Sequence, residues 1–249
     1  MKINTTHITS QKPKAPDFKN KIQTFFETAN AWGVFVMGST FVLMLGAAYL
    51  VYILQNDFTQ FNNIREDYSY GGSLRHLVRP QDYGNALPWN RAVTFVVNHD
   101  VPHNDGFRSW LLSPQDEHLA HVYMLGRDGG VPLIYSDNNE SHYLEDKDRW
   151  LNLYKRPDIT AMITFHNALH GESMVMLYES DILLVFRRGD RGIVAINKSD
   201  SDQRVDFNTW GLKNPGTYID LIHNHRLTIS ENRLSLLIPS RSAQMWLLD

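Results

Sequence analysis

The sequence contains no cysteine among its 249 residues, which excludes disulfide bonds and thiolate metal sites. It also lacks a strong excess of charge, because the formal net charge is −3, and a nucleic-acid partner is therefore not expected. No internal repeat is visible in the chain. The absence of cysteine does not fix the compartment, because an oxidising compartment also tolerates a cysteine-free protein.

What is present is typical of a globular protein, with 43% hydrophobic and 20% charged residues. The length allows one large domain or two smaller ones. Aromatic residues make up 12% of the chain and include six Trp and eleven Tyr. They suit either a large core or surfaces on which sugars stack, and the core is the favoured interpretation because aromatic side chains dominate cores generally.

Charged residues are also absent from residues 31–54, which read AWGVFVMGSTFVLMLGAAYLVYIL. A helix over this run would be about 36 Å long at about 1.5 Å per residue, enough to cross a hydrocarbon core of about 30 Å. Trp32 lies near one end, and Tyr49 and Tyr52 near the other, as interfacial aromatic residues often do. The run predicts a single transmembrane helix over residues 31–55, embedded in a lipid bilayer.

Two other interpretations of this run are a buried core helix and a cleaved signal peptide with LGAA as its cleavage site. A core helix of this length nearly always carries a polar face, which is missing here. A signal peptide has a shorter apolar region of about 7–15 residues and a shorter preceding tail. A retained anchor is therefore the prediction.

The orientation of the anchor follows from its flanking cations. Arg65 is the only cation in the first stretch after the run, whereas five precede it: Lys2, Lys12, Lys14, Lys19 and Lys21. The positive-inside rule then places the N-terminus in the cytoplasm and the remaining body outside it. Residues 1–30 are predicted to form a polar, basic cytoplasmic tail.

Residues 56–171 alternate between strand and helix patterns. The runs 92–98 and 131–137 are apolar, without alternation, and predict strands that are covered on both faces of a parallel sheet. A helix is predicted to follow Ser113, a suitable N-cap, and a second helical segment to be interrupted at Pro157 and closed by Gly171. This order indicates an α/β unit.

Residues 172–249 contain short β-like runs separated by turn residues at intervals of about 8–12 residues, which indicates an antiparallel sandwich of about eight strands. The predicted fold class is therefore α+β: a single transmembrane helix, a partial (β/α) barrel segment and a β-sandwich.

The part of the chain from about Asp57 onward resembles the C-terminal half of an α-amylase of glycoside hydrolase family 13. FVVNHD (residues 95–100) resembles the family's fourth sequence region, at the end of barrel strand 7. YMLGRDGGVPLIYSD (residues 123–137) resembles the seventh helix leading into strand 8, and the closing segment resembles the family's C-terminal β-sandwich. The resemblance covers about three-quarters of the chain.

The resemblance implies retaining hydrolysis of α-1,4-glucans, in which two carboxylates about 5 Å apart do the covalent and acid/base work. A third carboxylate stabilises the transition state, and the match assigns that role to Asp100. The same match gives His99, Asn98 and Asp137 as substrate contacts at the C-terminal ends of barrel strands. It implies no cofactor; a structural calcium is compatible with the family, but the usual region for its site is absent.

Nothing before Ala92 resembles the regions that carry the nucleophile Asp or the general-acid Glu. A full barrel takes about 200–250 residues, so barrel strands 1–6 are predicted to be missing between the membrane run and strand 7. The chain therefore has the helper residue without the two groups that make and break bonds, and it is not expected to be an enzyme by itself.

Several other polar groups have simpler interpretations than a functional site. HDVPHND (residues 99–105) and DNNE (residues 137–140) carry possible metal ligands, but they are interpreted as polar loops, so no metal site is predicted. His118 and His121 are predicted to lie on a solvated helix face, and His223 and His225 on the exposed side of a strand. FRRGDRG (residues 186–192) is predicted to form a hairpin turn with solvated basic neighbours.

Three functions remain open: a membrane-anchored, non-catalytic binding or docking module outside the cytoplasm, one half of a split α-glucan hydrolase completed by another chain, and a single-span accessory subunit of a larger membrane complex. The first is preferred. Strands without their barrel neighbours would expose apolar faces and unpaired edges, so a second copy or another protein chain is expected to cover them. An α-glucan is the ligand that the resemblance implies.

Overall fold

The computed structural model describes Met44 and residues 55–69, 71–137 and 143–249. The chain divides into two compact units, Met1–Val51 and Tyr52–Asp249, and apart from Met44 the described residues belong to the second. The predicted tail (residues 1–30) and the predicted membrane helix (residues 31–55) thus lie outside the described residues, except for Met44 and Gln55. Within the described ranges, no helix is both long and apolar enough to cross a bilayer.

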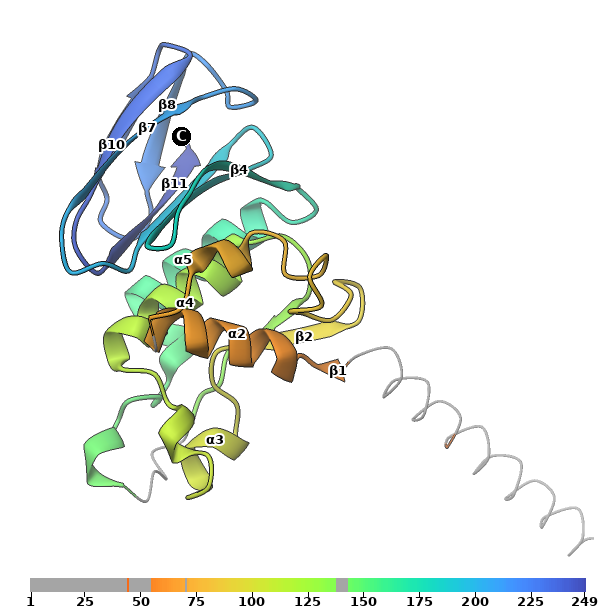
Figure 1. Cartoon of the computed structure of the whole chain (residues 1–249). Helices are drawn as coiled ribbons and strands as arrows, with labels where there is room; N and C mark the ends of the chain where they lie inside the picture. The colour runs from red at the N-terminus through yellow and green to blue at the C-terminus, as the bar shows by residue number, and fades with distance from the viewer. Residues whose placement is uncertain (1–43, 45–54, 70, 138–142) are drawn as a thin grey trace, which may run out of the picture. The chain divides into compact units, whose positions relative to one another are not determined.

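A parallel sheet begins the described body (Figure 1), in the order β1 (Gln55–Asn56), β2 (Ala92–Phe95), β3 (Val131–Leu133). The backbone N–H of Gln55 donates to the carbonyl of Arg91 at 2.8 Å, and that of Asp57 to Val93 at 3.0 Å. The sequence predicted two strands here, barrel strands 7 and 8. The third strand corrects that prediction, because β1 precedes β2 in parallel where barrel strand 6 would stand.

Helix α2 (Phe58–Ser69) follows β1 and was also missed. Asp57 begins it, since its carboxylate accepts the backbone N–H of Gln60 at 2.9 Å, which satisfies one donor of the first turn. Phe61, Ile64 and Tyr68 recur at helical spacing and are buried. The connection onward to β2 contains the predicted short helix, the 3₁₀ helix η1 (Leu74–Leu77).

Helices α4 (Pro114–Gly126) and α5 (Pro157–Ala168) lie between the parallel sheet and the sandwich (Figure 1). Ser113 caps α4 as predicted, because its hydroxyl accepts the N–H of Asp116 at 3.1 Å. Pro157 stands at the first turn of α5, where its missing N–H has no helical partner to lose. One hydrophobic core joins these helices to the sandwich, with Leu119, Phe165 and Phe186 fully buried.

The antiparallel sandwich has eight strands, as predicted. Six form the sheet β4-β5-β6-β11-β8-β9 and two form the pair β10-β7. A second core fills the space between these sheets and includes Val185, Tyr218 and Trp246. The bounds of the eight strands are β4 Met174–Glu179, β5 Leu183–Arg188, β6 Gly192–Asn197, β7 Gln203–Asn208, β8 Gly216–Asp220, β9 Arg226–Ile229, β10 Arg233–Ile238 and β11 Ser242–Leu248.

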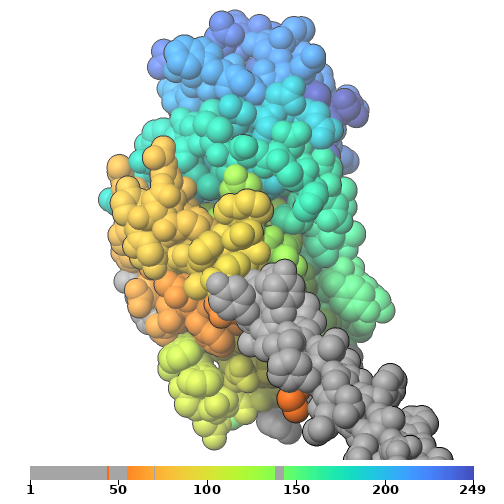
Figure 2. Space-filling view, turned by 90° about the vertical axis from the view of Figure 1, so that its right-hand side faces the viewer, coloured from red at the N-terminus to blue at the C-terminus, as the bar shows by residue number. Residues whose placement is uncertain are grey.

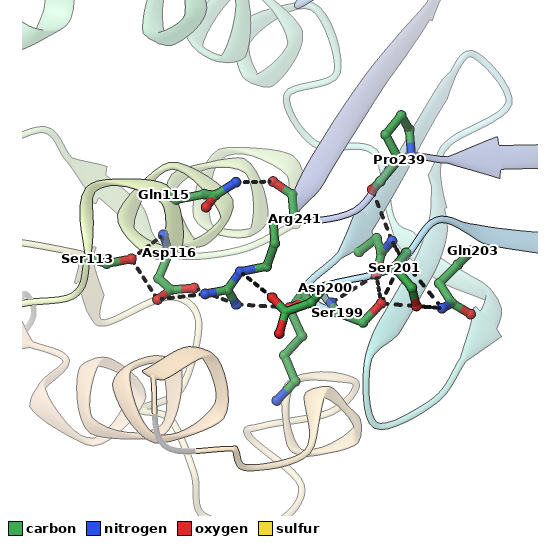
Figure 3. Close-up of polar contacts among 11 residues, drawn as sticks. Ser113, Gln115, Asp116, Ser199, Asp200, Ser201, Gln203, Pro239 and Arg241 are labelled. Atoms are coloured by element: carbon green, nitrogen blue, oxygen red, sulfur yellow. Dashed lines mark hydrogen bonds and ion pairs between the residues drawn. The ribbon is translucent and has the colours of Figure 1, made fainter.

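Arg241 connects the sandwich to helix α4 (Figure 3). Its guanidinium pairs with the carboxylate of Asp116 at 3.1 Å and donates to the carbonyl of Lys198 at 2.9 Å. The carbonyl of Arg241 accepts from the side-chain amide of Gln115 at 3.1 Å. Because Asp116 lies in the first turn of α4, this network holds the helix against the sandwich at a defined angle.

Arg188 makes a second connection and corrects a prediction. The hairpin turn at Gly189 and Asp190 is present, but the basic residue before it is not solvated, since Arg188 is only 2% exposed. Its guanidinium donates to four carbonyl oxygens where α4 and α5 end: those of Gly126, Arg127, Leu169 and Glu172. A cation at helix C-termini is stabilised by the carbonyls left without helical partners.

Two histidine predictions have different outcomes. His121 is buried rather than solvated, and its ring N–H donates to the carbonyl of Glu117 at 2.8 Å. Burial lowers the pKa of His121, because a charged imidazolium would lose its hydration. His223 and His225 are exposed as predicted, although they lie in the connection after β8 rather than on a strand.

Candidate functional site

The predicted site lies where strand β2 ends. Asn98 is buried, and its side-chain oxygen accepts the backbone N–H groups of Asp100 at 3.1 Å and Val101 at 3.3 Å. Asn98 therefore holds the turn that begins α3 (Asp100–His103), a role that sequence reasoning did not assign to it. Its predicted contact with substrate stays a prediction.

His99 and Asp100 project from this turn into solvent. Their side chains are 76% and 46% exposed, and the imidazole nitrogen Nε2 lies 3.3 Å from a carboxylate oxygen of Asp100. An accessible carboxylate beside an imidazole can accept and donate hydrogen bonds to hydroxyl groups of a ligand. The geometry is compatible with the predicted roles of both residues.

The end of strand β3 contributes a second group of polar side chains. His103 Nε2 lies 2.8 Å from the Tyr135 hydroxyl and 3.8 Å from a carboxylate oxygen of Asp137. Asp137 is buried, and its backbone N–H donates to the carbonyl of Trp150 at 3.2 Å. We call Asn98, His99, Asp100, His103, Tyr135 and Asp137 the strand-end cluster. It combines the predicted site residues of two neighbouring strands with His103 and Tyr135, which were not predicted to be in the site.

An ionic network supports the loop that carries α3. The Arg108 guanidinium donates to the carbonyl of Pro102 at 3.2 Å and pairs with Asp146 at 2.7 Å. Asp146 in turn lies 3.3 Å from Arg149, which pairs with Glu117 of α4 at 2.6 Å. Asp146 and Glu117 are both buried, so these links fix the loop to the helix layer.

Aromatic side chains lie beneath the same loop. The rings of Phe61 and Phe95 stack with centroids 5.2 Å apart, and Val101 belongs to the same small core. Trp110 lies 6.2 Å from Phe61 by ring centroids. The strand-end cluster therefore rests on a packed base that joins α2, β2 and the loop after α3.

The possible metal ligands of the two loops do not converge in the described structure. Among the described residues, no group of three or more histidine and carboxylate side chains is arranged to hold a metal ion. Asn138, Asn139 and Glu140 of the DNNE segment lie outside the described residues.

Comparison with known proteins finds one matching family model and several similar proteins. Residues 178–249 match the family described as alpha amylase, C-terminal all-beta domain. An alpha-amylase of Aeromonas hydrophila is 43% identical over 198 residues, which cover 78% of this chain and 41% of the relative. The chain is alpha-amylase-like. An alpha-amylase of Clostridium acetobutylicum is 28% identical over 197 residues, covering 74% of this chain and 24% of the relative.

The fold of the alpha-amylase-like body agrees with these matches. The structure of an alpha-amylase from Malbranchea cinnamomea superposes with a TM-score of 0.57 at 16% identity, over 74% of this chain and 43% of that one. The chain thus spans less than half the length of these relatives. The likeness confirms the predicted resemblance to the C-terminal region of family 13 α-amylases, with a partial barrel segment and an antiparallel sandwich.

Proposed function

We propose that this alpha-amylase-like chain is a non-catalytic, membrane-anchored module whose body docks onto another protein chain outside the cytoplasm. The observation that carries the proposal is the open edge at β3, one of the two edge strands of the parallel sheet. Strand β3 pairs with β2 on one side, and among the described residues no strand pairs with its other side. Val131 and Leu133 on this edge are 52% and 37% exposed.

An edge of this kind favours a partner that adds a strand. Parallel sheets normally have covered faces and neighbours on both sides, because their strands are apolar throughout. An edge strand presents a row of backbone donors and acceptors, which another chain can pair with. We assign the edge to a different protein chain, and pairing with a second copy of this chain would instead appear as a homodimer when the particle is sized.

The proposed lack of catalytic activity is supported by two missing carboxylates. Hydrolysis with retention needs a nucleophile and a general acid, and the 249 residues contain no segment that resembles either of the family's regions. Loss of such groups lowers rates by orders of magnitude. Asp100 and His99 would then contact an α-glucan without cleaving it.

The membrane anchor rests on the uncharged run of residues 31–54 and on the cations before it. Gln55 pairs with Ala92 in the sheet, which corrects the predicted end of the helix at residue 55, and the proposed anchor therefore covers residues 31–54. The proposed orientation puts the N-terminus in the cytoplasm and residues 55–249 outside it.

A docking test combines purification with a substitution at the edge. The full-length chain is extracted in mild detergent, its particle size is measured, and each co-purifying chain is identified by mass spectrometry. We expect one partner chain in a defined ratio, and we expect Leu133→Lys to release it, because a charge at the interface would lose its hydration. Leu237→Lys is the matched control, since Leu237 is 47% exposed on β10 of the sandwich. Equal partner recovery from both variants would reject the proposed edge.

The split hydrolase is the second candidate, and the position of Asp100 favours it. The carboxylate lies at the C-terminal end of β2, the end at which barrel enzymes carry catalytic groups. In this case the partner supplies the nucleophile and the acid, and the co-purified complex hydrolyses starch. Asp100→Asn would abolish that hydrolysis without releasing the partner, whereas a complex that is inactive with intact Asp100 supports the docking role.

A further inference from the structure

Two histidines lie side by side in the connection between strands β8 and β9 of the sandwich. The connection covers residues 221–225 and reads LIHNH. The rings of His223 and His225 have centroids 5.8 Å apart, and their planes differ by 21°. Both residues are exposed, and we call them the histidine pair. The C-terminal part of the sandwich, which carries this connection, is the blue region at the top of Figure 2.

Backbone hydrogen bonds fix the connection that presents the histidine pair. The N–H of Asp220 donates to the carbonyl of His225 at 2.9 Å, and the N–H of Asn224 donates to the carbonyl of Asp220 at 2.7 Å. Asn224 stands between the two histidines with a φ of 58°, in the left-handed region that asparagine adopts more readily than most residues. The pair therefore belongs to a tight turn that is bonded at both ends.

A buried carboxylate orients one of the two imidazoles. The side chain of Asp220 has no exposed surface, and its Oδ2 lies 2.7 Å from Nδ1 of His223. The other oxygen, Oδ1, accepts the backbone N–H groups of Ile222 at 3.1 Å and Met245 at 3.0 Å. Because a carboxylate can only accept, the proton in the bond to His223 belongs to Nδ1 of the ring.

This tautomer leaves the second ring nitrogen of His223 available for a ligand. With the proton on Nδ1, Nε2 of the neutral imidazole has a free lone pair. The side chain of His223 is 41% exposed, so a dissolved ion can reach the ring. Histidines that bind metals commonly show this arrangement, in which one nitrogen donates to a carboxylate and the other binds the ion.

One cation can bind both members of the histidine pair. Zn–N bonds of about 2.0–2.1 Å place two ligating nitrogens about 3–4 Å from each other. Rings with centroids 5.8 Å apart are close to that arrangement. Asp220 holds His223 in place, whereas the exposed side chain of His225 can change rotamer to complete the site. Two nitrogens leave further positions to water, so this site differs from the sets of three or more converging ligands, which the described residues lack.

The chemistry around the histidine pair selects the class of cation. Imidazole nitrogen suits Zn²⁺, Cu²⁺ and Ni²⁺, whereas Ca²⁺ and Mg²⁺ prefer oxygen ligands. The carboxylate behind His223 raises the basicity of the ring and so strengthens a bond to a metal. Arg226 is the next cation along the chain, and its guanidinium lies 3.9 Å from the carboxylate of Asp249, which offsets its charge. The chain has no cysteine, so no thiolate competes for the ion.

We propose that His223 and His225 bind a divalent transition-metal cation of the Zn²⁺ class, with Asp220 orienting His223. The bound ion would stabilise the turn that leads into β9, an edge strand of the six-stranded sheet. The site is separate from the strand-end cluster. It depends neither on the proposed docking role nor on the proposed anchor, because all its residues belong to the sandwich.

The test measures zinc binding to the full-length chain in detergent, by competition with a chromogenic zinc chelator. We expect Zn²⁺ to bind, and we expect His223→Gln and His225→Gln each to weaken binding by about tenfold or more, because each removes a nitrogen ligand. Ca²⁺ and Mg²⁺ should not displace the zinc. Zinc should also raise the unfolding temperature of the unchanged chain more than that of either variant, since a ligand stabilises the state that binds it.

The matched control is His76→Gln. His76 is also exposed, at 56%, and its Nδ1 lies 2.9 Å from the buried carboxylate of Asp67. It differs from His223 in having no second histidine ring beside it among the described residues. His76→Gln should therefore change the zinc affinity by less than about twofold.

A second readout counts the ligands directly. Electron paramagnetic resonance of bound Cu²⁺ should show coupling to two imidazole nitrogens in the unchanged chain, and to one in His223→Gln and His225→Gln. The proposal is overturned by unchanged zinc affinity in both variants of the pair, by an equal loss in His76→Gln, by displacement of zinc with Ca²⁺, or by coupling of Cu²⁺ to a single nitrogen in the unchanged chain.

Discussion

The sandwich and the parallel sheet of this chain differ in how well other residues of the chain cover and pair with their strands. Every residue of β6 is buried, and the strand has neighbours on both sides. In β3, by contrast, two of three residues are exposed, and its pairing is with β2. An antiparallel strand can pair with the next strand through a short turn, as β5 does with β6, or with a distant strand, as β6 does with β11. Parallel strands need long connections, so each additional neighbour requires a further helix and strand.

This contrast explains why the two regions offer different surfaces. The sandwich buries its apolar residues in two cores, one against the helices and one between its sheets. Helices cover one side of the parallel sheet, and the edge strand β3 stays exposed. We therefore expect stability to reside mainly in the sandwich and its helix layer, and binding of a partner to involve the ends and edge of the parallel sheet.

The largest expected effect on stability comes from replacing a phenylalanine by alanine in each of the two regions. Phe186 is fully buried between the sandwich and the helices, whereas Phe58 at the start of α2 is 39% exposed. Phe186→Ala should lower the free energy of unfolding by about 3–5 kcal/mol through lost burial and a cavity. Phe58→Ala should cost about 1 kcal/mol, because less surface is removed from water. Urea titration followed by fluorescence measures both, and equal losses would contradict the contrast.

A smaller loss of stability is expected from replacing Arg188, which binds the carbonyl groups where α4 and α5 end. Arg188→Met should lower the free energy of unfolding by about 2–3 kcal/mol, because buried carbonyls lose a charged donor. Arg187→Met on the same strand is the control and should cost less than about 1 kcal/mol, since Arg187 is partly exposed. If the two variants lose equal amounts of unfolding free energy, the four contacts of Arg188 do not stabilise the connection between the helices and the sandwich.

The smallest expected effect is the contribution of His121 to the pH dependence of the free energy of unfolding. Burial places the pKa of His121 in the folded protein below the value of 6.5 expected when unfolded, so the unfolded state binds the proton first as the pH falls. Its contribution to stability is present above about pH 6.5 and decreases below it, by at most about 1.4 kcal/mol per pH unit. Glu117, His118 and Arg156 lie in its electrostatic surroundings.

The measurement compares unfolding free energies at about pH 7.5 and about pH 5.5. His121→Gln should reduce the difference, because one proton-binding group of the unfolded chain is removed. His166 has its pKa shifted in the same direction and should account for part of the remainder. An unchanged pH dependence in His121→Gln would show that His121 titrates alike in both states.

Local sequence signals predicted the elements that their own residues specify. Ser113 capped a helix, Gly189 made a hairpin turn, and the eight β-like runs became eight strands. Strand β1 had no such signal, because it is two exposed polar residues whose pairing is decided by Ala92, far along the chain. Helix α2 did have one, in the cap at Asp57 and the spacing of its buried residues.

The candidate site was predictable in position but not in its internal contacts. That Asn98, Asp100 and Asp137 follow neighbouring strands could be read from the sequence. The pairing of His103 with Asp137 could not, because it depends on how the loop after α3 folds back. The burial of Arg188 and His121 was missed for a similar reason, since their partners lie at helix ends or on a face that only packing defines.

The short strand β1 also determines how the body would respond to mechanical force. Two backbone hydrogen bonds of 2.8 and 3.0 Å, from Gln55 and Asp57, hold the start of the described chain to β2. A pull on the chain at Gln55 reaches these bonds before the sandwich, because they are the first strand contacts of the described backbone. Tension would therefore detach β1 at low force and uncover β2, leaving the eight-stranded sandwich folded.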